Sequence, residues 1–153
     1  MKIRLFFVAL ATLLFSNGCT KSKSAPAGPA VSQTLTVGST TSTVTSTYRL
    51  NGGADIGANS DGNYELAFDF PTAPVPGTYD VVDYSTPATG MQVKVVATEI
   101  SPTTLYYAGA APQAVTVTLN NGKYSIVMSP VTATPQQSTI NLSVKMSASF
   151  SEK

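Results

Sequence analysis

The stretch Ile140-Asn-Leu-Ser-Val-Lys-Met-Ser-Ala-Ser-Phe150 carries the clearest structural signal in this chain. Apolar and polar residues alternate along it, and successive side chains of a β-strand point to opposite faces. This alternation predicts a strand with one face in a core and the other in water. Because the strand is long and two-faced, we expect it to be central in a sheet or paired on both sides.

The same two-residue period recurs upstream. Val115–Leu119 and Tyr124–Met128 alternate in this way, and Asn120-Asn121-Gly122 lies between them. Asn-Gly between two alternating runs is a strong hairpin signal, because the tight turn requires positive φ. We therefore predict a β-hairpin here.

Further short runs complete the strand pattern, and loops rich in Gly, Pro and Asn separate them. The other expected strands are residues 34–37, 44–50, 64–70, 78–84, 91–99 and 103–108. No window repeats apolar residues at helical spacing, and 11 Gly and 10 Pro discourage helices. About eight or nine strands at this spacing predict an all-β, antiparallel β-sandwich, with a small antiparallel β-barrel as the alternative. The residues expected to be buried together are Tyr64, Leu66, Phe68, Leu142, Val144 and Met146.

The N-terminus has the form of an export signal. Lys2 and Arg4 precede an apolar run, Leu5–Phe15, which is followed by Ser-Asn-Gly and then Cys19, the only cysteine. A positively charged start, an apolar run of roughly 7–15 residues and small residues before the cut define a signal peptide. A membrane-spanning helix needs about 20 apolar residues, so this run is too short to span a bilayer comfortably. An ordinary secretory signal with a chance cysteine is the alternative.

This segment resembles the lipobox signal of bacterial lipoproteins, and Ser16 in place of the usual leucine is similar to the looser form found in Bacteroidetes. The resemblance implies diacylglyceryl transfer to the Cys19 sulfur, cleavage after Gly18 and acylation of the new amino group by a fatty acid such as palmitate. Residues 1–18 are then a cleaved signal peptide, 19–33 a lipidated flexible tether and 34–153 a single domain. The implied location is the cell envelope, anchored by lipid in the outer membrane, on either its periplasmic or its surface face.

The domain itself resembles uncharacterised small β-sandwich lipoproteins of Bacteroidetes. The resemblance rests on the Pro76-Gly-Thr-Tyr79 turn, the Asn121-Gly-Lys-Tyr124 hairpin and the amphipathic last strand. It implies no known activity.

Composition removes most catalytic chemistry. The chain has no histidine, and a lipidated Cys19 offers no free thiol. Ser-His and Cys-His nucleophiles, imidazole bases and imidazole metal ligands are therefore excluded. Glu65 and Asp69 share one strand face about 13 Å apart, which exceeds the roughly 5–9.5 Å between paired glycosidase carboxylates. We predict no enzymatic activity and no cofactor.

Charge also limits the partners. Charged residues make up 11% of the chain, and acidic residues outnumber basic ones once Lys2 and Arg4 leave with the signal. A nucleic-acid-binding domain needs a basic face, so we expect no nucleic-acid partner. The expected partners are the membrane, through the lipid on Cys19, and an envelope protein or a glycan.

Residues 55–65 are the densest cluster of side-chain oxygens and the weak candidate for a calcium site. An EF-hand requires glycine where Ser60 stands and glutamate where Leu66 stands, so the pattern fails. We interpret the segment as a loop joining two strands, in which such residues tolerate positive φ. The metal-site candidates would be Asp55, Asn59, Asp61 and Asn63.

Seven tyrosines and no tryptophan leave the tyrosines as candidate contacts for a ligand. In a strand, adjacent Tyr106 and Tyr107 would point to opposite faces, and Tyr84 is also expected outside. Our first hypothesis is a lipid-anchored, non-enzymatic structural or protein-interaction module. The second is a glycan or small-ligand binding module using Tyr84, Tyr106 or Tyr107, and an enzyme is the third. An exposed aromatic row beside a cleft would favour the second hypothesis over the first.

Overall fold

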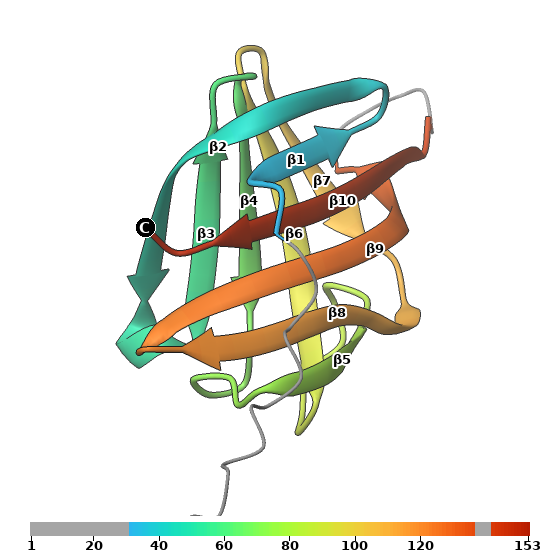
Figure 1. The fold of residues 1–153 in the computed structure, drawn as a ribbon. Coiled ribbons are helices and arrows are strands. Elements are labelled where there is room, and N and C mark those ends of the chain that lie inside the picture. The colour runs from blue at the N-terminus through green and yellow to red at the C-terminus, as the bar shows by residue number, and fades with distance from the viewer. Residues whose placement is uncertain (1–30, 137–141) are drawn as a thin grey trace, which may run out of the picture.

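The computed structural model describes residues 31–136 and 142–153 (Figure 1). The predicted lipidation residue Cys19 and the predicted signal peptide lie outside the described residues. These residues contain no α-helix, so they contain no helix that could cross a membrane. The strands are β1 (Thr34–Val37), β2 (Thr40–Leu50), β3 (Asp55–Ser60), β4 (Tyr64–Asp69), β5 (Gly77–Val81), β6 (Gln92–Ile100), β7 (Thr103–Ala108), β8 (Ala111–Asn120), β9 (Lys123–Pro135) and β10 (Val144–Ser151), with one 3₁₀ turn, η1 (Asn51–Gly53).

The strands form one continuous sheet that folds over itself. Its order is β10-β1-β2-β3-β4-β6-β5-β8-β9-β7, and further pairings join β10 to β9 and β6 to β7. All pairings are antiparallel except that between β5 and β6. In Figure 1, β3, β4 and β6 run steeply in one layer, whereas β8, β9 and β10 cross in front of them in the other. The prediction of an all-β, mostly antiparallel sandwich is confirmed, and the described residues form ten strands in place of the eight or nine expected.

Two details of strand pairing were also predicted correctly. The β8–β9 hairpin closes at the pair Asn120 and Lys123 around Asn121 and Gly122, whose φ angles are +52° and +77°. These positive values are the ones that a two-residue hairpin turn requires. The last strand, β10, is paired on both sides, with β1 and with β9.

The core lies between the two layers and is built from the inward positions of the alternating strands. Phe68 on β4 and Phe150 on β10 are fully buried, and their ring centroids lie 5.9 Å apart across the layers. Phe70 extends this aromatic contact to Tyr79, with ring centroids 5.0 Å apart and an edge-on arrangement. Around these rings, almost every strand contributes branched aliphatic side chains or alanines.

The prediction that Leu142 belongs to the core is wrong. Leu142 is 66% exposed, although the alternating pattern placed it inside. The reason is that pairing of β10 with β9 begins at Val144, so the ladder does not hold residue 142 against the core. Leu66, Phe68 and Met146 are buried as predicted, while Tyr64 and Val144 are half-buried and pack against the core.

A clamp made by Arg49 and Glu152 holds the C-terminal end against β2 and the β8–β9 hairpin. Arg49 donates to both carboxylate oxygens of Glu152 from Nε and Nη2, and also donates to the Gly122 carbonyl at 2.7 Å. The Tyr124 N–H donates to Glu152 Oε2 at 2.6 Å, and the Arg49 guanidinium lies 4.6 Å from the Tyr124 ring centroid. The Glu152 side chain is only 8% exposed.

The clamp also sets the acidity of Glu152. Burial acts to raise the pKa of this carboxyl, but the hydrogen bonds from Arg49 and the Tyr124 N–H, with the Arg49 charge, outweigh it and hold the pKa below its ordinary value. A carboxylate whose pKa is lower in the folded chain stabilises the fold only while it is ionised.

We expect the exposed and buried apolar residues of the last segment to respond differently to truncation. Met146→Ala should lower the free energy of unfolding by about 2–5 kcal/mol, because it opens a cavity in the core. Leu142→Ala is the matched control and should change it by less than about 0.5 kcal/mol, as surface substitutions do. Urea unfolding of both variants checks this, and equal losses would contradict the assignment of inner and outer positions.

Removing the charge of Glu152 should destabilise the protein in a pH-dependent way. Glu152→Gln should cost about 1.5–3 kcal/mol at pH 7, the range for hydrogen bonds to a charged group. The stabilisation is fully present above the ordinary pKa of glutamate and is lost as pH falls through the lowered pKa of the folded state. The free energies of unfolding of the wild type and of Glu152→Gln, measured as a function of pH, should therefore converge in acid. A constant difference between them across pH 2–7 would refute the clamp.

Candidate functional site

Two of the three predicted ligand-contacting tyrosines lie together. Tyr107 is on the outer face of β7, and Tyr84 lies in the turn after β5, which is closed by the Thr86 N–H donating to the Asp83 carbonyl at 2.8 Å. The two rings stack with centroids 4.3 Å apart and an interplanar angle of 31°. We call Tyr84 and Tyr107 the tyrosine pair.

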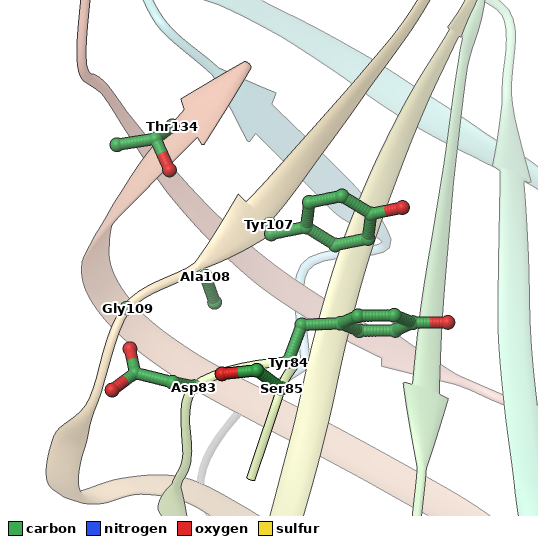
Figure 2. Close-up of a pocket in the computed structure, with 7 residues that line it drawn as sticks. All are labelled: Asp83, Tyr84, Ser85, Tyr107, Ala108, Gly109 and Thr134. Atoms are coloured by element: carbon green, nitrogen blue, oxygen red, sulfur yellow. The ribbon is translucent and has the colours of Figure 1, made fainter. Parts of the chain in front are cut away.

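The tyrosine pair borders an open pocket of about 340 Å³. Figure 2 shows the Tyr107 ring above the Tyr84 ring, both extending in the same direction, with Asp83 and Thr134 on the opposite side of the view. The lining combines two aromatic rings with hydroxyl, carboxylate and backbone groups, and aromatic rings beside a few polar groups are a feature of ligand sites. The lining residues are Asp83, Tyr84, Ser85, Tyr107, Ala108, Gly109 and Thr134.

Neighbouring polar contacts hold this arrangement in place. The Tyr107 hydroxyl donates to Gln136 Oε1 at 2.9 Å, and Asp83 Oδ1 accepts from the Ala110 N–H at 3.1 Å. Lys94 Nζ lies 5.3 Å from the Tyr84 ring centroid, within the range of a cation–π interaction. Tyr84 is nevertheless 47% exposed, so part of the pair is open to solvent.

Tyr106 does not join the pair, because its side chain points to the inner face of β7. It packs against the core, and its hydroxyl donates to Glu99 Oε2 at 3.1 Å. Burial, followed by the bond to Glu99 and its charge, raises the pKa of Tyr106. The sequence correctly separated the faces of Tyr106 and Tyr107, but only the structure shows that the outer ring meets Tyr84.

The oxygen-rich segment 55–65 was predicted as a loop, and this is wrong. Asp55–Ser60 is strand β3, because Ile56 and Ala58 alternate into the core, and only a tight turn separates it from β4. Asp55 and Asp61 therefore stand at opposite ends of a six-residue strand, about 20 Å apart. The four residues do not converge on one point.

Each of the four weak metal candidates has its own structural partner. Asp61 Oδ1 accepts from the Thr43 N–H at 2.7 Å, and Asn59 Nδ2 donates to Ser46 Oγ at 3.1 Å. Asn63 Nδ2 donates to the Ser101 carbonyl at 2.8 Å, and Asp55 accepts from Asn51. Over residues 31–136 and 142–153, no three acidic, Cys or His side chains group as metal ligands.

Strand register brings two carboxylates together that the sequence analysis did not pair. Asp55 on β3 lies directly opposite Asp69 on β4. Burial, then the nearby Asp55 charge, raises the pKa of Asp69, while Lys94 acts to lower it. Asp69 remains an exposed side chain, so the pair lies on the outer surface of the sheet and not in an enclosed active site.

A third outer tyrosine, Tyr48, was also missed. Tyr48 pairs with Gly57 across β2 and β3, and its ring lies where a side chain at position 57 would be. Its hydroxyl donates to Glu65 Oε1. A glycine inside a strand often marks a close approach of another group, and this was the available signal.

Comparison with known proteins adds no relative. The sequence matches no family model, and it finds no match among curated proteins or among solved structures.

Adding a methyl group at position 57 should displace the Tyr48 ring. We expect Gly57→Ala to lower the free energy of unfolding by about 1–3 kcal/mol, as overpacking does. In Tyr48→Ala the ring that covers position 57 is absent, so Gly57→Ala should cost less in that variant than in the wild type. A double-mutant cycle measures this difference. Strictly additive losses would mean that Tyr48 does not cover Gly57.

Proposed function

We propose that this chain is a lipid-anchored, non-enzymatic module of the bacterial cell envelope that binds a ligand at the tyrosine pair. The observation that carries the proposal is the exposed Tyr84 ring, stacked on Tyr107 beside an open pocket. An aromatic surface beside a pocket favours a ligand-binding module over a purely structural one.

The physical character of the pair supports binding. Tyrosine offers a large, amphipathic contact area and has only two side-chain torsions, so little conformational entropy is lost on binding. The stacking of Tyr84 and Tyr107 and the bond from Tyr107 to Gln136 restrict those torsions before a ligand arrives. Preorganisation of this kind lowers the cost of binding.

The strand pairing argues against one common mode of protein interaction. Each strand in the described part of the chain has a hydrogen-bonded neighbour on both sides for at least part of its length. A partner that adds a strand to a sheet needs an unpaired edge. Only short stretches of backbone are left for such an addition, so we expect a partner of this domain to be recognised mainly by side chains on a face.

A protein-interaction module is the second candidate function. Three exposed apolar side chains near β5 favour it: Val75 is 59% exposed, Met91 41% and Leu119 42%. Exposed apolar surface can mark a protein-binding site when its members form a continuous patch.

Non-enzymatic action is supported by the available side chains. The chain has no histidine, and the Asp55–Asp69 carboxylates meet on an open sheet surface. Such a surface is open to water. General acid–base sites instead exclude water, and this exclusion shifts the pKa values of their side chains and strengthens electrostatic interactions.

The anchor is a separate part of the proposal and rests on residues 1–19. Cys19→Ser should abolish labelling by a radioactive fatty acid and move the protein from the membrane to the soluble fraction. More than one acyl chain is needed for firm anchoring, so loss of the lipidated residue should release the chain. Continued labelling of the variant in membranes would contradict the lipoprotein assignment.

The tyrosine pair should carry ligand binding. Ligand-observed NMR screening of the non-lipidated Cys19→Ser protein, against a library of sugars and small aromatic compounds, should give hits. We expect Tyr84→Ala and Tyr107→Ala to weaken these hits at least tenfold. Tyr106→Phe is the matched control on the opposite face and should not. Binding that is indifferent to both alanine variants, or the absence of any hit, would contradict the proposal.

A further inference from the structure

Five outer residues lie in register across one layer of the sheet. Tyr48 is opposite Gly57, Gly57 opposite Ala67, Ala67 opposite Val96, and Val96 opposite Tyr107. Residues paired across neighbouring strands point to the same face. We call this set the cross-strand row. It joins the tyrosine pair to Tyr48 across β2, β3, β4, β6 and β7.

The row is apolar in the middle and aromatic at both ends. Its three central residues are a glycine, an alanine and a valine, and the Tyr48 ring lies over Gly57. At the other end, Figure 2 shows that the rings of Tyr84 and Tyr107 both extend from β7 and the adjoining turn across β6. Four strand spacings separate the backbones of the outer strands, or about 19 Å along the sheet. A single small molecule in the pocket would not reach Tyr48.

Polar groups flank the row on both sides. One neighbouring row contains Asp55, Asp69 and Lys94, in register with one another. The other contains Asn59, Glu65 and Thr98. The carboxylates accept hydrogen bonds, the Lys94 ammonium donates them, and the Asn59 amide and the Thr98 hydroxyl can do both. Three carboxylates against one lysine also make this face unfavourable for an anionic polymer.

We propose, as an extension of the proposed function, that the ligand is an uncharged saccharide chain of several units that lies along the cross-strand row, with Tyr48 as its second aromatic contact. The C–H faces of sugar rings are apolar and pack on aromatic rings, while the hydroxyl groups at their edges are hydrogen-bond donors and acceptors. The cross-strand row offers apolar and aromatic contacts for the ring faces, and the polar rows on both sides offer hydrogen bonds for the hydroxyl groups. The acidic flanks exclude polyanions from this role.

The experiment measures affinity as a function of chain length. Isothermal titration of the Cys19→Ser protein uses β-1,4-linked oligomers of glucose and of N-acetylglucosamine, from one to six units, with polygalacturonate oligomers as the anionic comparison. For at least one neutral series, we expect affinity to rise at least tenfold from the shortest bound oligomer to the hexamer. The anionic oligomers should bind at least tenfold more weakly.

Variants of the far end of the row separate this inference from the proposed function. Tyr48→Ala should abolish the gain with length, and Tyr48→Phe should keep it because the ring remains. Ala67→Arg blocks the middle of the row from the surface, so it tests the same point even where Tyr48→Ala does not fold. Thermal melts identify the folded variants.

The possible outcomes divide as follows. Length-independent binding that survives Tyr48→Ala and Ala67→Arg but is lost in Tyr84→Ala overturns the extended site and leaves the proposed function standing. Binding that is unaffected by Tyr84→Ala overturns the proposed function. Preference for the anionic oligomers, or no binding of either neutral series, overturns the saccharide assignment, while the NMR screen decides separately whether the tyrosine pair binds other ligands.

Discussion

The packing of Phe68 against Phe150 is the contact on which the two-layered structure depends. The two residues lie on strands far apart in sequence, and both rings are fully buried. Offset or tilted aromatic pairs add about 0.5–1.5 kcal/mol beyond the burial of their area. Because each strand has only one apolar face, neither layer can shield its own side chains, and the inner faces must cover each other.

This mutual burial determines where function can reside. The apolar residues of the sheet point inward, and its hydrogen bonding continues from one layer to the next. A partner of the described strands therefore meets mainly the outward side chains of the two layers, and few unpaired strand edges. On the outer face of one layer, small residues lie between Tyr48 and the tyrosine pair. The features that we associate with binding are therefore the outward half of the same alternation that builds the core.

Several elements were predictable because their causes are local. Alternation identified the strands, and Asn121-Gly122 identified the hairpin through its need for positive φ. The pattern failed at Leu142, where alternation continues beyond the last residue that the ladder holds. It also failed at residues 55–60, where Gly, Asn and Asp suggested a loop although Ile56 and Ala58 alternate as in a strand. Composition gave the wrong answer there, and periodicity contained the right one.

The sequence by itself determined the all-β class, the inward and outward faces of most strands, and the absence of histidine chemistry, because these depend on residue type and two-residue periodicity. The tertiary structure alone decided that Tyr84 stacks on Tyr107, that Tyr48 covers Gly57 and that Asp55 opposes Asp69. Each of these contacts joins residues on different strands or on a strand and a distant turn. Their meeting depends on strand order and register, which the cooperative burial of the whole core fixes and no short stretch of sequence encodes.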